Sequence, residues 1–211
     1  MSAVRNLVSI RANIYEKIMV ENRKPLSQKE KTLLLSIARD AVNAAAHGKR
    51  PPNLDLACLP AALREKGASF VTLTTGGQLR GCIGALEANK PLALDVQEHA
   101  EAAATQDYRF PPVTPQEIPT IHIEVSRLTP PVPLEYQNGQ QLAEMLKPGR
   151  DGVVIRDGIR RATFLPQVWE KLPSPEDFLS HLCLKMGASP DDWRRKKMTV
   201  YTYQVEEFEE E

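Results

Sequence analysis

Apolar side chains recur every three or four residues in several segments of the chain, and this spacing predicts helices. The first such helix covers about residues 6–22, and Pro25 ends it. Ser27 and Glu30 form the pattern of a capping box, which predicts a second helix from there to Gly48. Further helices are expected at about 60–66, after Pro91, around Leu142, and over about 174–186.

Strict alternation of apolar and polar residues predicts strands in other segments. These strands cover residues 69–75, 79–84, 120–128 and 198–205, and a hairpin is expected over 153–165. The first two strands are joined by Gly76-Gly77 and the later hairpin by Asp157-Gly158, both favoured two-residue turns. The last residues, 206–211, are mostly Glu, and we expect them to be frayed and solvated.

The order of these elements repeats along the chain. A hairpin, a helix and a strand occur around Gly76, Pro91 and Ile121, and again about 80 residues later. The repeat suggests a duplication of a ββαβ unit. Because the strands are short and hairpin-linked, we expect an α+β protein with antiparallel-rich sheets flanked by helices.

Composition and charge narrow the classes of function. The 211 residues are 42% apolar and 26% charged, as in an ordinary soluble protein. Twenty-seven basic residues balance 27 acidic ones, so nothing drives the chain toward nucleic acid or an anionic membrane. No apolar run approaches the roughly 20 residues that span a bilayer. The charged N-terminus lacks the pattern of a signal peptide, so the cytoplasm is the expected location.

Cysteine and histidine spacing gives no sign of a metal centre. Cys58, Cys82 and Cys183 are widely separated, so they form neither paired zinc ligands nor a cluster able to hold iron and sulfur. The four histidines also lack ligand spacing, and a metal site would need convergence in the tertiary structure. We predict no metal and leave any cofactor unknown.

The strand Leu79-Arg80-Gly81-Cys82-Ile83-Gly84 carries the most suggestive chemistry. A period of two puts Leu79, Gly81 and Ile83 on one face and Arg80 with Cys82 on the other. Gly81 and Gly84 suggest a bulge or a close approach by backbone or ligand. An arginine near a thiol favours the thiolate, so Cys82 is a candidate nucleophile. The alternative is that Arg80 pairs with a structural carboxylate and Cys82 only packs.

The strand over 120–128 adds polar candidates on one face, opposite Ile121, Ile123 and Val125. Glu124 could act as a general base or hold Arg80 as its paired carboxylate. We therefore predict that Arg80 and Glu124 lie within reach of one another. His122 shares the face of Glu124 and could activate Cys82.

The loop over 107–119 is punctuated by four prolines and carries Asp107 and Arg109. A stiff loop of this kind suits a charged group held at the edge of a site. We expect Arg109 to line the same site as Arg80 and to favour a ligand with a carboxylate or phosphate. The alternative is that Asp107 and Arg109 pair with neighbours and fix the loop.

Several separated motifs together resemble one known family. They are LRGCIG at 79–84, DYRFPP at 107–112, IEVS at 123–126, GVVI at 152–155, ATFLPQV at 162–168 and FLSHLC at 178–183. Their order and spacing are similar to those of the AmmeMemoRadiSam system protein A family, the AMMECR-domain proteins, from about Leu26 to the C-terminus. One departure is Tyr108, because the family usually has proline at that position.

The resemblance implies further expectations. Residues 1–25 would form an N-terminal helical extension and 26–211 an AMMECR-like domain, with two subdomains and a cleft between them. The family is often encoded beside Memo-like and radical-SAM proteins, which are therefore expected partners. We expect a small-molecule-binding protein with Cys82 and Glu124 as chemically active candidates and Arg80, Gly81, Gly84, Asp107, Arg109 and His122 as binding candidates. The alternative is a non-catalytic module that docks a partner through the LRGCIG surface, and whether the protein is an enzyme stays open.

Overall fold

The computed structural model describes residues 24–211, and the helix predicted over 6–22 lies outside these residues. The described chain forms two compact units, residues 24–129 with Glu206–Glu211, and Pro130–Val205. Each unit combines helices with a sheet of antiparallel strand pairs, which confirms the predicted α+β class.

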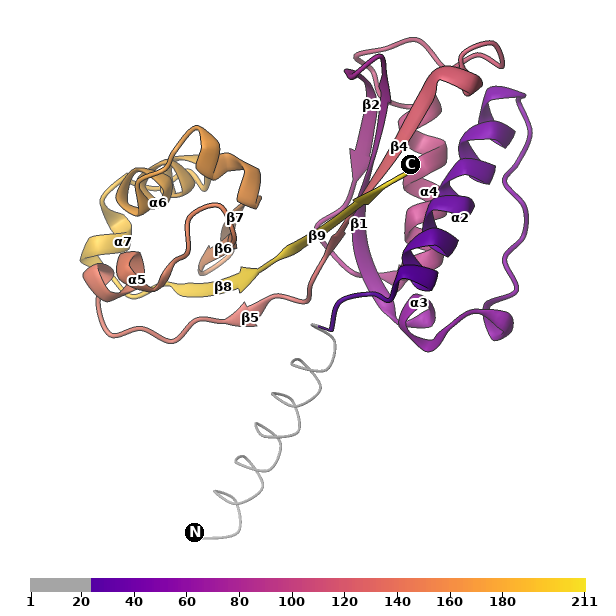
Figure 1. The fold of residues 1–211 in the computed structure, drawn as a ribbon. Coiled ribbons are helices and arrows are strands. Elements are labelled where there is room, and N and C mark those ends of the chain that lie inside the picture. Colours follow the sequence, from indigo (N-terminus) through magenta and orange to yellow (C-terminus); the bar gives the residue numbers. More distant parts are fainter. Residues whose placement is uncertain (1–23) are drawn as a thin grey trace, which may run out of the picture. The chain divides into compact units, whose positions relative to one another are not determined.

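The first unit packs two long helices on one face of its sheet (Figure 1). Its helices are α2 (Gln28–Ala46), α3 (Ala61–Arg64) and α4 (Leu92–Thr105), with 3-10 turns η1 (Leu56–Cys58) and η2 (Ile118–Thr120). Its strands are β1 (Lys66–Thr75), β2 (Gln78–Gly84), β3 (Lys90–Pro91), β4 (Ile121–Leu128) and β9 (Val205–Glu209). The sheet order is β2-β1-β4-β9, and β3 pairs with the start of β1.

Helix α2 begins and ends where its local sequence predicts. The Ser27 side chain accepts a hydrogen bond from the Glu30 backbone N–H, and the Glu30 carboxylate accepts one from the Ser27 N–H at 2.7 Å. Gly48 follows the helix with a φ of 65°, a conformation that glycine adopts without steric cost. The capping box and the glycine stop therefore fix both ends locally.

The two faces of the first sheet differ in chemistry. Val71 and Leu73 of β1 and Ile123 and Val125 of β4 are fully buried in the core that α2 and α4 complete. Directly paired residues of neighbouring strands share a face. The opposite face, here called the motif face, therefore carries the alternate positions: Thr72, Thr74, Cys82, His122 and Glu124.

A buried polar cluster joins α4 to β1. The Ser69 hydroxyl donates to Asp95 Oδ2 at 2.7 Å, and His99 Nδ1 lies 3.1 Å from the same oxygen. All three residues are buried. Because buried polar groups are costly unless paired, this cluster fixes the position of α4 on the strand that also carries Thr72.

The acidic C-terminal segment is not frayed, and this prediction was wrong. Residues Val205–Glu209 form β9, which pairs with β4 and covers its edge. Glu206 contacts Lys31 at 2.9 Å and Arg127 at 3.2 Å. Glu210 pairs with Arg39.

Apolar packing and backbone pairing complete the attachment of β9. Phe208, between the two paired glutamates, packs against the core of the first unit. The backbone N–H of Glu210 donates to the carbonyl of Ile123 at 3.1 Å. Because strand residues alternate between faces, Glu207 and Glu209 lie on the motif face. Cations on α2 and β4 thus order a segment whose own sequence favours solvent.

The second unit repeats the strand order of the first. Its elements are β5 (Val132–Pro133), α5 (Gly139–Met145), β6 (Gly152–Asp157), β7 (Arg160–Phe164), η3 (Pro166–Glu170), α6 (Pro175–Lys185), α7 (Asp192–Arg195) and β8 (Thr199–Tyr203). The sheet order is β5-β8-β6-β7. The order β7-β6-β8 matches β2-β1-β4, so the predicted ββαβ unit is present twice.

Aromatic packing builds the core of the second unit. The rings of Trp169 and Phe178 stack with centroids 3.7 Å apart. Trp169 and Trp193 are both buried. Cys183 is fully buried on α6, and burial raises the pKa of its thiol. This cysteine is therefore a packing residue.

Candidate functional site

A bulge in β2 sets the geometry of the LRGCIG strand. Leu73 of β1 pairs with Gly81, whereas the next residue, Thr74, pairs with Leu79, so Arg80 is the extra residue of the bulge. The bulge corrects the predicted alternation, because pairing with Thr74 puts Leu79 on the motif face and not beside Gly81. A single inserted residue reverses the parity of everything beyond it, and sequence alternation alone cannot reveal this.

Both glycines of the strand are required by close packing. A Cβ on Gly81 would lie 2.3 Å from the carbonyl oxygen of Ala103 in α4. A Cβ on Gly84 would lie 2.3 Å from the ring of Phe70. The close approach expected at these positions is therefore made by a helix backbone and by an aromatic ring.

Asp107 and Arg109 form a clamp on the outer edge of β2. The buried Asp107 carboxylate accepts hydrogen bonds from the Cys82 N–H at 2.8 Å and from the Arg109 N–H at 3.2 Å. Arg109 Nε and Nη2 also donate to this carboxylate at 2.9 and 2.6 Å, and Nη2 lies 3.4 Å from the Cys82 carbonyl oxygen. The clamp thus satisfies both backbone groups of Cys82 that an edge strand would leave unpaired.

Electrostatics stabilises the charged form of both clamp residues. The hydrogen bond from the Arg109 side chain, with those from the Cys82 and Arg109 backbone, holds the pKa of Asp107 well below its usual range. The same pairing raises the pKa of Arg109. The structure therefore shows Asp107 and Arg109 paired with each other, which is the structural alternative stated above for these two residues.

Glu117, rather than Glu124, is the carboxylate that holds Arg80. Arg80 Nε and Nη2 donate to the two oxygens of Glu117 at 2.7 and 3.3 Å. Thr114 contributes its N–H and its hydroxyl to Glu117 Oε2. These hydrogen bonds lower the pKa of Glu117 to about 2, and the one from Arg80 has the largest effect. The predicted pairing of Arg80 with Glu124 was wrong.

An aromatic ring lies near both arginines. The guanidinium carbons of Arg80 and Arg109 are 5.9 and 5.6 Å from the centroid of Phe110, within the range of cation–π contacts. Each guanidinium also faces its own carboxylate, Glu117 or Asp107. The positive charge expected from two arginines is therefore balanced within this cluster.

Three chemically different side chains form a row across the motif face. Thr72 of β1 pairs with Cys82 of β2 on one side and with Glu124 of β4 on the other. The Thr72 hydroxyl donates to Cys82 Sγ at 3.4 Å. Since neighbouring strands lie about 4.8 Å apart, the thiol and the carboxyl are separated by roughly two strand spacings. The hydroxyl lies between them.

Glu124 holds its proton more tightly than an ordinary glutamate. Burial raises its pKa, and the carboxylates of Glu207 and Glu209 on β9 raise it further. The hydrogen bond from Ser126 and the neighbouring His122 act in the opposite direction but do not cancel the increase. A raised pKa favours the protonated form, which suits a carboxyl to proton transfer.

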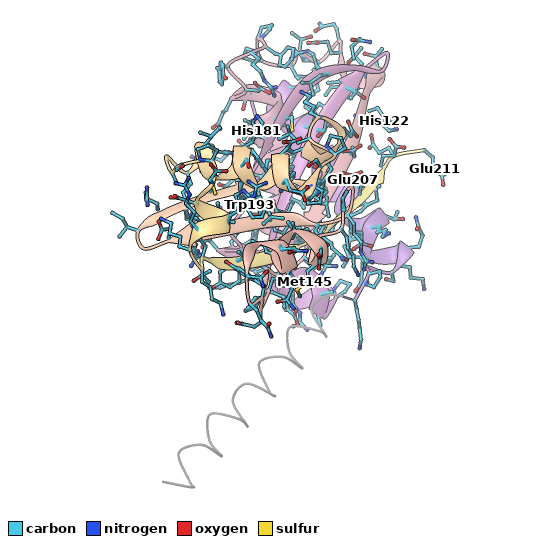
Figure 2. The ribbon with its side chains drawn as sticks, turned by 90° about the vertical axis from the view of Figure 1, so that its left-hand side faces the viewer. His122, Met145, His181, Trp193, Glu207 and Glu211 are labelled. Atoms are coloured by element: carbon cyan, nitrogen blue, oxygen red, sulfur yellow. The ribbon has the colours of Figure 1, made fainter. Side chains whose placement is uncertain are left out.

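His122 lies in a different row from Cys82. It pairs with Thr74, and its Nε2 lies 2.6 Å from the carbonyl oxygen of Glu210. His122 and Glu207 extend from the neighbouring strands β4 and β9 (Figure 2). The register brings Glu124 and not His122 into line with Cys82, so His122 is not placed to activate the thiol.

Sequence reasoning missed two residues of this site. Thr72 carried no signal in the sequence, because its role depends on the register between strands. Glu117 carried a usable signal, since Thr114-Pro-Gln-Glu117 is a Thr-x-x-Glu pattern. In it the Glu117 carboxylate accepts hydrogen bonds from the N–H and the hydroxyl of Thr114.

Two further properties bear on the class of the protein. Among residues 24–211, no group of three His, Cys, Asp or Glu side chains is arranged to hold a metal ion. Within the same range, no helix has the length and apolar character needed to cross a membrane.

Comparison with known proteins identifies the relatives of this chain. The AMMECR1 sequence profile matches residues 35–208. A protein from Thermofilum pendens is 40% identical over 203 residues, which cover 88% of this chain and 92% of the relative. One from Methanothermobacter thermautotrophicus is 40% identical over 193 residues, covering 89% and 97%.

A solved structure agrees with these relatives. The crystal structure of an uncharacterized protein from Pyrococcus horikoshii is similar with a TM-score of 0.72 and 34% identity, and the match covers 88% of this chain and 94% of that one. The family match over most of the chain, the identities near 40% and the shared fold agree with the motifs at 79–84 and 107–112. The chain belongs to the AMMECR1 family.

Proposed function

We propose that this protein binds a small molecule against the motif face of its first sheet, beside the LRGCIG strand. The ligand carries a carboxylate or phosphate that contacts Arg109, and Cys82 and Glu124 are the groups able to act on it. The cleft between subdomains implied by the family resemblance stays a prediction. So does action together with Memo-like and radical-SAM proteins, which the same resemblance implies.

The clamp on β2 is the observation that carries this proposal. Asp107 fixes the guanidinium of Arg109 next to Cys82, and the Arg109 side chain is still 43% exposed. Its hydrogen bonds within residues 24–211 use Nε and Nη2, which leaves Nη1 for an incoming anion. A guanidinium oriented before binding loses less entropy when it contacts a ligand.

The row of thiol, hydroxyl and carboxyl supports chemistry on a bound ligand. Thr72 donates to Cys82 Sγ, and Glu124 keeps a raised pKa on the far side of Thr72. A thiol can act as nucleophile and a carboxyl as general acid or base. Binding is the proposed activity, and catalysis would use these two groups.

Free thiols support a cytoplasmic location. Cys58, Cys82 and Cys183 are all unpaired, one exposed, one partly buried and one buried. Unpaired cysteines are typical of reducing compartments. We therefore place the proposed activity in the cytoplasm.

Ligand binding can be tested by thermal unfolding with a panel of small carboxylates and phosphate esters. At least one compound should raise the melting temperature, and Glu124→Gln and Cys82→Ser should each reduce this rise. Glu135→Gln and Cys58→Ser are matched controls, because both residues are exposed and lie outside the motif face. The proposal fails if no compound raises the melting temperature. It also fails if the control variants reduce the ligand-induced rise as much as the site variants do.

A second candidate function is docking of a protein partner on the same surface. Leu79 and Tyr108 support it, because they are 42% and 96% exposed and lie on β2 and between the two clamp residues. Large exposed apolar residues on a rigid support are typical of interaction sites. Titration calorimetry with a purified Memo-like protein tests it.

The docking experiment has a natural control. Leu79→Ser and Tyr108→Ser should weaken binding by about tenfold or more, which corresponds to roughly 1.4 kcal/mol. Ile159→Ser removes a fully exposed apolar side chain from the β6–β7 turn of the second unit and should leave binding unchanged. Equal binding by all three variants would rule out docking through the LRGCIG surface.

A further inference from the structure

A cavity open to solvent lies at the C-terminal end of α2. The chain leaves the helix there and returns alongside it toward α3 (Figure 1). Its volume is about 390 Å³, within the range of small-molecule sites. One wall is a single stripe of α2, since Asp40, Asn43, Ala44 and His47 are spaced by three, one and three residues. The returning loop forms the other wall with Lys49, Arg50 and Pro52.

Hydrogen bonds hold both walls of this cavity in place. Gly48 and Lys49 donate their N–H groups to the carbonyls of Ala45 and Ala44, each at 2.9 Å, as in a Schellman turn. Farther along the loop, Gln97 Nε2 on α4 donates to the Pro52 carbonyl at 2.8 Å. The loop is therefore tied to the first unit at both ends of the segment that lines the cavity.

The charges that line the cavity lack ion-pair partners among residues 24–211. Asp40, Lys49 and Arg50 are exposed and take part in no ion pair or hydrogen bond of their side chains there, whereas Arg39, next to Asp40, is fully engaged with Glu210 and two backbone carbonyls. Two cations on the loop and one carboxylate on the helix thus line the same cavity. The end with the two cations favours an anionic group of a ligand, and the end with the carboxylate favours a hydrogen-bond donor.

His47 adds a polar group with a defined orientation. Its Nδ1 lies 2.8 Å from the carbonyl oxygen of Asn43, a distance at which Nδ1–H donates. Nε2 is then the ring atom that can accept a hydrogen bond from a ligand or, once protonated, donate one.

We propose that this cavity is a second ligand site, separate from the motif face, for a small molecule with a phosphate or carboxylate and an amine or hydroxyl. Lys49 and Arg50 bind the anionic group. Asp40 and the side-chain oxygen of Asn43 accept hydrogen bonds from the amine or hydroxyl. The bipolar lining excludes a purely apolar occupant, because it would leave these charged groups desolvated without partners.

NMR titration of ¹⁵N-labelled protein with two probes tests the proposal. Inorganic phosphate supplies the anion alone, and O-phosphoethanolamine adds an amine. Saturable shifts are expected at amides of residues 40–52 with both probes, with tighter binding of O-phosphoethanolamine. Lys49→Ala with Arg50→Ala should weaken both probes by about tenfold or more. Lys29→Ala with Arg64→Ala removes two exposed cations elsewhere on the first unit and should have no effect.

Asp40→Asn separates a real site from general attraction of anions. Removal of the carboxylate should strengthen binding of inorganic phosphate, because a like charge is gone, and weaken binding of O-phosphoethanolamine, because the amine loses its partner. Effects of the same sign on both probes would overturn the assignment of Asp40. Chemical shifts that do not saturate would overturn the site itself. So would an equal loss of affinity in the control variant Lys29→Ala with Arg64→Ala.

Discussion

Replacement of Asp107 by alanine tests the role of the clamp on β2. The substitution removes a carboxylate that accepts hydrogen bonds from two backbone N–H groups, those of Cys82 and Arg109, and from the Arg109 side chain. A buried donor left without an acceptor costs about 1–3 kcal/mol. The half-exposed guanidinium regains water and adds less than about 1 kcal/mol. The free energy of unfolding should therefore fall by about 1–4 kcal/mol, and the melting temperature by roughly 2–16 °C.

Urea unfolding followed by circular dichroism measures this loss. Asp40→Ala is the matched control, since it removes an exposed aspartate of the same unit and should change stability by less than about 0.5 kcal/mol. A loss of that same small size for Asp107→Ala would refute the view that the clamp satisfies the edge of β2.

The loss caused by Asp107→Ala should also depend on pH. The folded-state pKa of Asp107 lies below its ordinary value, so the carboxylate stabilises the fold above about pH 4, and this contribution disappears as the pH falls through the folded-state pKa. The difference between wild type and variant should therefore be constant near neutral pH and shrink on acidification. A difference that grows as the pH falls would contradict the assigned direction of the pKa shift.

Three further predictions concern the glycine of β2, the carboxylate that holds Arg80, and the exposure of two cysteines. Gly81→Ala should reduce the free energy of unfolding by several kcal/mol, because its Cβ would lie 2.3 Å from a carbonyl oxygen of α4. If chemical denaturation shows little change in this free energy, this packing against α4 is contradicted. Glu117→Gln should lose less stability than wild type between pH 4.5 and 2, since pairing with Arg80 lowers the pKa of Glu117 to about 2 and its contribution disappears over that range. In the folded protein a thiol reagent should label Cys82 well before the fully buried Cys183; the reverse order, read by peptide mass, would overturn the assignment of Cys183 to the core.

The sequence alone was sufficient where structure depends on neighbouring residues. The capping box at Ser27 and the glycine at 48 define the ends of α2, because hydrogen bonds between residues three or four apart decide them. Gly76-Gly77 similarly forms the predicted two-residue turn between β1 and β2, in which Thr75 pairs with Gln78. The turn between β6 and β7 is Gly158-Ile159, one residue later than the predicted Asp157-Gly158, because Asp157 itself pairs with Arg160. The family motifs also located the candidate site on β2 and on the loop that begins at Asp107.

The tertiary structure decided which of these groups meet. Local pattern could not predict that Arg80 is a bulge residue held by Glu117, or that Thr72 separates Cys82 from Glu124, because both depend on the register between strands. The clearest case is β9. Its glutamates disfavour a strand locally, but cations of α2 and β4, brought close by the fold, pair with Glu206 and with the adjoining Glu210. Ion pairs between residues more than 70 positions apart thus determine the last strand, and no window of sequence contains both partners.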